Sequence, residues 1–300
     1  LRINNMVELY LQYEYWVAVV QLVLAMLGMG AGLQVADFQK VVQEPKAVSL
    51  GLMMQLIIVP LIAFGFISYT NLPPGMVIGI AIIAAIPGGA VSNIFTFLAR
   101  GNVPLSISIT ALTSFACLVT TPLILEFLVA DFMPVDFAMP AMQVAVEIGF
   151  CLLVPLLLGM RFLQKYPQYA QPFSSFCVRG SLLGIAIIVL GSLGAGRINF
   201  SYTTSADLIL LSIFILSLTI AGIFITKTFG LSQAENTAIE MEVVVRNINL
   251  GLLIKISLFP LVAGQTNPLA DMVLLSLLLY GGWQLIMGFI FITWRRKQAS

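Results

Sequence analysis

Long apolar stretches alternate with short polar breaks along nearly the whole chain. A helix needs about 20 mostly apolar residues to cross a bilayer, and about nine such stretches can be marked in the 300 residues. They cover approximately residues 12–33, 47–69, 76–99, 103–129, 137–162, 178–195, 206–229, 234–258 and 268–294. The breaks between them are rich in Pro, Gly and Asn, which are typical of turns. The pattern predicts an all-α polytopic membrane protein with a single transmembrane domain over residues 1–300.

Composition and charge exclude several classes of protein. Charged residues make up 9% of the chain and hydrophobic residues 60%, whereas an average soluble domain is roughly 25% charged. The net charge of +1 provides no basic face for nucleic acid. The chain has no histidine, so Ser–His nucleophiles and His-ligated metals are excluded. No span holds a Ser–Lys pair or paired aspartates for an intramembrane hydrolase, and we expect no enzyme.

The distribution of Lys and Arg predicts the orientation, because cytoplasmic loops carry an excess of both. Of the 14 basic residues, the three near the C-terminus fall inside together with most of the others when the C-terminus is cytoplasmic. Only Arg2, Arg197 and Lys255 then lie outside, and Arg246 falls within a span. We therefore expect the N-terminus outside and the C-terminus in the cytoplasm. Lys255 is close enough to a helix end for its side chain to snorkel to the interface.

Two stretches are interrupted by polar and helix-breaking residues. The third contains Pro87, Gly88 and Gly89, followed by Ser92 and Asn93. Proline removes a backbone donor and glycine weakens a helix. Unpaired backbone groups are expensive in lipid, so such a break is covered by protein or lines a wet cavity. A simple packing kink is the alternative.

The eighth stretch carries charges at the depth of the membrane. Glu242 lies about ten residues into the span, roughly 15 Å along a helix, and Arg246 is one turn further on the same face. The alternative is a structural Glu–Arg pair that only neutralises itself, but such a pair does not need the neighbouring Asn247, Asn249 and Gly251. We expect a functional polar site here, and we assign no role to Glu240. Residues 87–93 and 246–251 should both be unwound and meet.

The two interrupted segments occupy comparable places in the two halves of the chain. Broken helices at corresponding positions indicate a transporter built from inverted repeats with its binding site between them. The predicted repeats cover about residues 1–130, with one leading helix missing, and about residues 137–297.

Several motifs resemble the bile acid:sodium symporter family. They are GMGAGL at 28–33, PGGAVSN at 87–93, LARGN at 98–102, Gln55, and Glu242 followed by Asn247. The resemblance covers nearly the whole chain. It implies a panel domain and a core domain, with two broken helices crossing at the centre of the core, and a secondary active transporter for bile acids or small carboxylates.

The resemblance also implies the ion ligands. The first sodium site would be formed by Ser92, Asn93, Ser106, Thr110 and Glu242. A second site would use Gln55 and Glu242, but its last position is Arg246 instead of the family's glutamine. Arginine offers only donors and cannot ligate a cation. We therefore expect one Na⁺ ion, with the Arg246 guanidinium reaching the Glu242 carboxylate and the Gln55 carbonyl in place of a second ion. Alternatively, Arg246 turns into the cavity and pairs with a substrate carboxylate.

Together these observations predict sodium-coupled symport of an organic anion by alternating access, in a cell (inner) membrane. The substrate-facing residues would be Asn93, Arg246, Asn247 and Asn249. The expected partners are the organic anion and the lipid bilayer, with no nucleic acid. Proton-coupled or sodium-independent transport is the first alternative, with Arg246 as a fixed cation. A receptor without turnover is the second.

Overall fold

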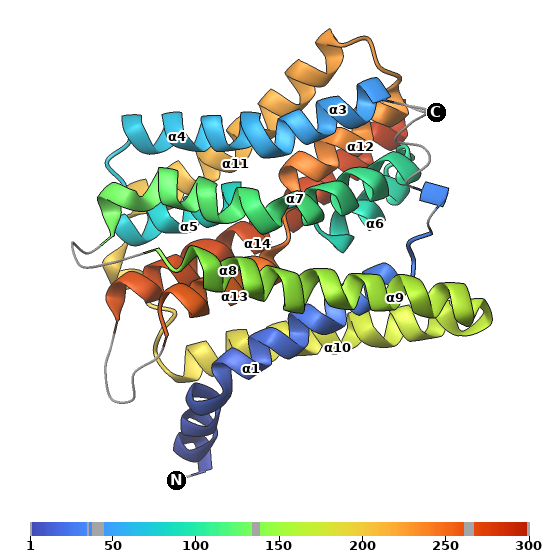
Figure 1. Ribbon diagram of the computed structural model, residues 1–300. Coiled ribbons are helices and arrows are strands. Elements are labelled where there is room, and N and C mark those ends of the chain that lie inside the picture. The colour runs from blue at the N-terminus through green and yellow to red at the C-terminus, as the bar shows by residue number, and fades with distance from the viewer. Residues whose placement is uncertain (1, 35, 38–44, 134–138, 261–266, 299–300) are drawn as a thin grey trace.

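Figure 1 shows the computed structural model, which describes residues 2–34, 36–37, 45–133, 139–260 and 267–298. Within these ranges the chain is almost entirely helical and forms no strand, only one isolated β-bridge. Seven helical segments are long and apolar enough to span a membrane: Val7–Gly30, Pro45–Tyr69, Val103–Phe132, Ala141–Lys165, Pro167–Gly194, Ser205–Thr228 and Pro268–Gln298. The predicted all-α membrane fold is confirmed. Residues 137–138 of the fifth predicted stretch lie outside the described residues.

The spanning segments are labelled in Figure 1 by their helical parts. They contain α1 (Arg2–Gly30), α3 (Pro45–Met53), η1 (Met54–Ile58), α4 (Val59–Tyr69), α7 (Val103–Val129), α8 (Ala141–Glu147), η3 (Ile148–Leu153), α9 (Val154–Lys165), α10 (Pro167–Gly194), α11 (Ser205–Thr228) and α14 (Pro268–Gln298). Two of these parts, η1 and η3, are π-helical turns inside longer helices.

The two remaining apolar stretches are each broken into two shorter helices. The third stretch forms α5 (Pro74–Ala85) and α6 (Ala90–Leu98), and the eighth forms α12 (Gln233–Val244) and α13 (Ile248–Leu258). The breaks, residues 86–89 and 245–247, are shorter than predicted. The side chain of Asn247 caps α13 by accepting from the Leu250 N–H at 3.3 Å, so the helix resumes at once and the expected unwinding through Gly251 is wrong.

The helices fall into two groups in Figure 1. Helices α1, α9 and α10 lie together in the lower part of the view, and α3 to α7, α11, α12 and α14 lie above them. The first group is closely packed. A Cβ added at Gly30 on α1 would come within 2.1 Å of the Leu156 carbonyl oxygen on α9, so only glycine allows this approach. In the second group α5 packs against α7 and α14, and α12 packs against α11. Helix α13 contacts both groups, through α1 and through α14.

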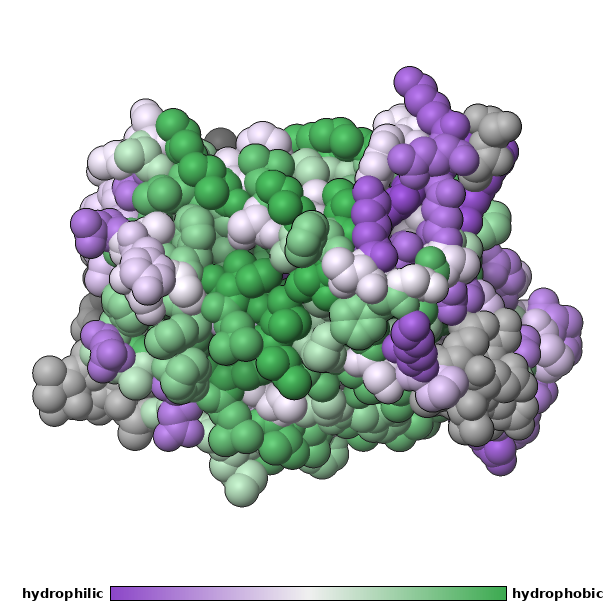
Figure 2. Space-filling view, turned by 90° about the horizontal axis from the view of Figure 1, so that it is seen from above, coloured by the Kyte–Doolittle hydropathy of each residue, from purple (hydrophilic) through white to green (hydrophobic). Residues whose placement is uncertain are grey.

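The surface agrees with a membrane environment. Figure 2 shows hydrophobic residues across the middle of the molecule and hydrophilic residues toward its two ends, most densely at the right-hand end of the view. Large apolar side chains such as Phe97, Leu190 and Phe224 are exposed at the surface of the protein. An exposed apolar band of this kind is expected where lipid replaces water.

Candidate ion and substrate site at the crossing of two broken helices

The two breaks meet each other directly. The Asn247 N–H donates to the Pro87 carbonyl oxygen at 2.9 Å, and Gly88 pairs with Arg246 in the isolated antiparallel bridge. Proline ends α5 because it has no N–H to donate, and its free carbonyl becomes the acceptor for the other break. The crossing therefore satisfies part of the backbone that each helix leaves unpaired.

Next to the crossing, the Glu242 carboxylate lies fully buried in the last turn of α12. Its Oε1 accepts hydrogen bonds from the Ser92, Ser106 and Thr110 hydroxyls at 2.5, 2.6 and 2.7 Å. None of the ion pairs in the described part of the chain includes Glu242. Burying an ionised carboxylate is costly unless a cation accompanies it, so this cluster of oxygens is a candidate place for a bound cation.

Asn93 completes this cluster. Its side-chain oxygen lies 2.8 Å from the Ser106 hydroxyl oxygen and 3.5 Å from the Thr110 hydroxyl oxygen. Ser106 and Thr110 lie one turn apart on α7, whereas Asn93 and Ser92 come from the first turn of α6. The structure thus brings together all five residues predicted for the first ion site. Carboxylate, amide and hydroxyl oxygens are the ligands preferred by hard cations.

Gln55 connects the carboxylate to the crossing. Its Oε1 accepts from the Gly88 N–H at 2.8 Å, and its Nε2 donates to Glu242 Oε2 at 3.0 Å. Gln55 lies in the π-helical turn η1, and such turns are frequent at functional sites. The amide therefore fixes the distance between the unwound backbone and the acidic side chain.

Arg246 is 2% exposed and its guanidinium is surrounded by oxygens. It donates to Gln55 Oε1 at 3.1 Å, to the backbone oxygens of Ile83 and Ala84 at 3.2 Å each, and to the backbone oxygen of Glu242 at 3.5 Å. The predicted contact with the Gln55 carbonyl is present. The predicted contact with the Glu242 carboxylate is not: α12 ends at Val244, so the two side chains do not share a helix face.

Two residues of α14 that were not predicted also support the crossing. Gln284 accepts from the Arg246 backbone N–H at 2.8 Å, and the buried Tyr280 hydroxyl donates to the Val244 carbonyl at 2.7 Å. Each satisfies a backbone group left free where α12 breaks. A glutamine in the middle of an otherwise apolar span was the one signal that could have indicated this role.

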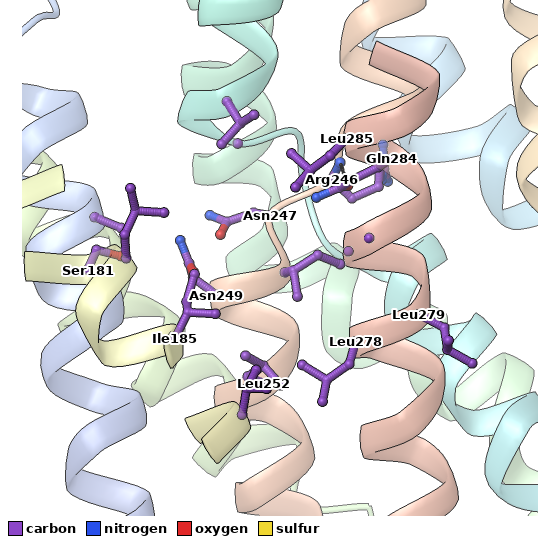
Figure 3. Close-up of a pocket in the computed structure, with 18 of the residues that line it drawn as sticks. Ser181, Ile185, Arg246, Asn247, Asn249, Leu252, Leu278, Leu279, Gln284 and Leu285 are labelled. Carbon is purple, nitrogen blue, oxygen red and sulfur yellow. Dashed lines mark hydrogen bonds between the residues drawn. The ribbon is translucent and has the colours of Figure 1, made fainter. Parts of the chain in front are cut away.

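A cavity of about 550 Å³ lies between α1 and α10 on one side and the crossing and α14 on the other. Its lining is mostly apolar, with Ser181, Asn247, Asn249 and Gln284 as polar exceptions besides Arg246. In Figure 3 the amides of Asn247 and Asn249 lie between Ser181 on α10 and Leu278 on α14. The first residues of α6 and α13 both line this cavity. Two helix N-termini, where positive ends of helix dipoles lie, therefore face the same space.

The predicted substrate residues divide between the two places. Asn247 and Asn249 line the cavity, and the buried Asn247 Nδ2 has no hydrogen-bond partner. Arg246 also belongs to the lining, but its guanidinium is directed to Gln55 and to the carbonyls of α5. Asn93 is not among the lining residues, and its side-chain oxygen faces the Glu242 cluster instead.

Three charged residues outside the crossing have defined partners. Glu240 on α12 pairs with Arg295 on α14 and accepts from the Thr226 hydroxyl at 3.2 Å. Glu147 accepts from Tyr15, Gln143 and Ser257. Lys255 is fully buried and 3.6 Å from Glu14. The prediction that Lys255 snorkels is wrong, because α13 is enclosed by other helices.

Comparison with known proteins agrees with this architecture. The sequence model of the sodium bile acid symporter family matches residues 19–231. An uncharacterized sodium-dependent transporter, YocS, of Bacillus subtilis is 30% identical over 231 residues, which cover 75% of this chain and 69% of that protein. The chloroplastic probable sodium/metabolite cotransporter BASS1 of Arabidopsis thaliana is also 30% identical, over 79% of this chain and 58% of that protein.

A human relative extends the match further along the chain. The sodium-dependent organic anion transporter of Homo sapiens is 24% identical over 291 residues, which cover 94% of this chain and 74% of that protein. These relatives are transport proteins and not enzymes, and the apolar helices of this chain make it an integral, multi-pass membrane protein. The family match covers more than half of the chain, and we conclude that this protein belongs to the sodium bile acid symporter family.

Proposed function

We propose that this protein is a secondary active transporter that couples the movement of an organic anion to sodium ions by alternating access. The observation that carries this proposal is the buried Glu242 carboxylate, which three hydroxyls and Asn93 surround beside a crossing of two broken helices. The names of the relatives, which include sodium-dependent transporters, favour sodium over another cation.

The ion would occupy the oxygen cluster around Glu242. In the structure the Ser92, Ser106 and Thr110 hydroxyl oxygens lie within hydrogen-bond distance of one carboxylate oxygen, Glu242 Oε1. A hydroxyl keeps two lone pairs, so a rotation of each O–H bond turns these oxygens toward a cation. Sodium would then neutralise Glu242 and connect α6, α7 and α12. Binding of the ion would in this way stabilise the crossing next to the substrate cavity.

Arg246 supports a stoichiometry of one sodium ion. Its guanidinium is held by four oxygens from Gln55, Ile83, Ala84 and Glu242, a shell that resembles the ligand set of a cation. A fixed positive charge in this place takes the position of a second ion. Because these donors are engaged, the guanidinium is a structural cation of the crossing and not the anchor of the substrate.

The cavity suits an anion with an apolar body. A volume of about 550 Å³ lies within the range of organic ligands, and most of its lining is apolar. The anionic group would be held by the helix N-termini of α6 and α13 together with the free Asn247 amide and Asn249. A bile acid-like molecule or a small carboxylate has this chemistry.

We place the protein in the cell (inner) membrane, with the N-terminus outside and the C-terminus in the cytoplasm. Arg295, Arg296 and Lys297 end α14, and cytoplasmic ends carry such clusters. Helices α1, α9 and α10 would form the panel that moves against the remaining core. Two inverted repeats, 1–130 and 137–297, would relate α5–α6 to α12–α13.

Transport by the purified protein in proteoliposomes tests this function. An inward sodium gradient should drive uptake of at least one labelled acid from a panel of bile acids and small carboxylates, and Glu242→Ala should abolish this uptake. The same variant should lose the thermal stabilisation by sodium, which amounts to about 2.7 kcal/mol when the ion is present at 100 times its Kd. Uptake driven only by a pH gradient would favour the proton-coupled alternative. Absence of counterflow for every acid would favour a receptor.

A further inference from the structure

Four charged side chains form a buried network away from the crossing. Arg197, between α10 and η4 (Phe200–Tyr202), donates to Glu14 on α1 and to Asp271 on α14 at 2.8 Å each. Lys255 on α13 lies 3.6 Å from the same oxygen of Glu14. The side chains of Arg197, Glu14 and Lys255 are 8%, 2% and 0% exposed, and that of Asp271 is 12% exposed. The network therefore contains two acids and two bases shielded from solvent.

Local structure holds Arg197 in place. Helix α10 ends at Gly194, and Gly196 adopts the left-handed conformation with φ of 70°, which glycine tolerates without strain. The chain then turns back, so that the Arg197 N–H donates to the Ser192 carbonyl at 2.9 Å. Tyr10 on α1 joins the Ser192 hydroxyl at 2.9 Å and donates to Glu14 at 3.3 Å. The end of α10 is thereby fastened to α1.

The network lies at one end of the substrate cavity and joins its two walls. Arg197 directly precedes Ile198, which lines the cavity. On the other wall, Asp271 lies one turn before the lining residue Leu275, and Lys255 lies one turn after the lining residue Leu252. Glu14 and Arg197 belong to the group of α1, α9 and α10, whereas Lys255 and Asp271 belong to α13 and α14. Separation of these groups at this end must break the network.

The network is balanced in charge but not saturated in hydrogen bonds. Glu14 Oε2 and Lys255 Nζ are buried without a hydrogen-bond partner. Buried ions repay the loss of water only when their geometry is good and their remaining groups are satisfied. These two atoms would gain water if the walls separated. The closed state is therefore held by the pairs with Arg197, and the unsatisfied atoms keep the cost of opening small.

We propose that Glu14, Arg197, Lys255 and Asp271 form a charge latch, which closes the cavity on the side of the α10–α11 connection and opens during transport. This inference rests on the proposed alternating access, and the proposed topology places the latch on the outer side. Removal of one charge would leave a buried charge unbalanced and favour the open, hydrated state. Removal of Glu14 and Lys255 together would restore the charge balance, because the Arg197–Asp271 pair remains.

Cysteine labelling tests the latch without any need for transport. The reporter is Ser181→Cys on the cavity wall, in a protein whose buried Cys117, Cys151 and Cys177 are replaced by alanine. A membrane-impermeant thiol reagent is applied to right-side-out and to inside-out vesicles without sodium. Glu14→Gln and Lys255→Met should each speed labelling by at least about fivefold from the side of the α10–α11 connection, the lower end of typical couplings between sites. The double variant should return to within about twofold of the parent rate.

Glu8→Gln is the control for Glu14→Gln, because it makes the same change at an exposed position of α1, and it should leave the labelling rate unchanged. If a buried substitution prevents folding, Asp271→Asn at the rim should give the same acceleration. Unchanged rates in the single variants, or a double variant that labels faster than either single one, would overturn the latch. Because the assay requires neither sodium nor substrate, failure of sodium-driven uptake would refute the proposed function and leave this result standing.

Discussion

Gly88 lies so close to Glu242 that a Cβ at this glycine would come within 2.1 Å of the carboxylate oxygen Oε2. No L side chain fits at this distance. The same glycine donates its N–H to Gln55, which in turn donates to Glu242. The unwound backbone of one broken helix and the acidic group of the other therefore form one packed unit, so a change at the break should directly alter the proposed ion site.

Gly88→Ala should displace the Glu242 carboxylate. Overpacking of a well-filled site costs typically about 1–3 kcal/mol, and here the neighbour that must move is the group that would bind the ion. We expect a lower melting temperature and loss of the sodium-induced shift, measured by thermal unfolding in detergent with and without sodium. Gly65→Ala on α4 is the control, because no atom lies within 4 Å of its added Cβ. A normal sodium shift in Gly88→Ala would contradict the site.

Removal of the hydroxyls on α7 should weaken sodium binding. Ser106→Ala and Thr110→Val each delete an oxygen that contacts Glu242. Hydrogen bonds to charged groups contribute about 1.5–3 kcal/mol, so we expect the sodium affinity to fall by roughly tenfold or more in each variant. Titration of sodium by calorimetry or by thermal shift measures this change.

Thr113→Val is the matched control for these variants. Thr113 is also buried on α7, but its hydroxyl donates only to the backbone oxygens of Ile109 and Thr110. Its removal should leave the sodium affinity within about twofold of the parent, since such bonds contribute little beyond the helix itself. Equal losses at Thr113 and Thr110 would show that α7 packing, and not ion ligation, controls the affinity.

Asn247→Asp should separate the two roles of this residue. The carboxylate keeps the cap of α13, because Asp caps helices as well as Asn, but it replaces the free Nδ2 donor with a negative charge. An anionic substrate should then bind at least about tenfold more weakly, by roughly 1.4 kcal/mol. The apparent KM for uptake measures this effect.

Asn102→Asp provides the comparison. Asn102 caps α7 by accepting from the Leu105 N–H at 3.1 Å and does not line the cavity. This variant should transport with an unchanged KM. Should Asn247→Asp also retain its KM, the substrate would not contact the Asn247 amide, and the anion would be held by the helix N-termini alone.

The residue types at the crossing could be predicted from the sequence, whereas their geometry could not. Pro87 and the two glycines mark one break because they cannot sustain a helix. Glu242 marks the other because a carboxylate is costly inside a membrane span. The resemblance to the family then assigned Ser92, Asn93, Ser106 and Thr110 to the same predicted ion site as Glu242. The length of each break depended instead on capping: Asn247 restarts α13 within one residue of the bridge.

The roles of the remaining charges depended on packing between distant helices. Glu240 had no assigned role because its partner, Arg295, is 55 residues away on α14. Lys255 lies near a helix end, which suggests snorkelling, but the fold surrounds it and places Glu14 beside it. The direction of the Arg246 side chain followed from the end of α12 at Val244, which sequence spacing alone did not indicate.

Arg246→Gln should create a second cation site. The substitution removes a fixed positive charge from a shell that contains Gln55 Oε1 and the backbone oxygens of Ile83 and Ala84, and it adds an amide oxygen to that shell. The oxygens would then face a gap with no cation, which a sodium ion can fill. We expect a second sodium-binding event by calorimetric titration and a Hill coefficient for sodium-driven uptake that rises from about 1 toward 2, since the coefficient is bounded by the number of sites.

Arg179→Gln, at an exposed position on α10, is the control and should keep single-site behaviour. Two sodium ions bound to the parent protein would show that the guanidinium does not replace an ion. A variant that loses mainly substrate affinity would instead assign Arg246 to the anion, against the orientation that its four acceptors give it.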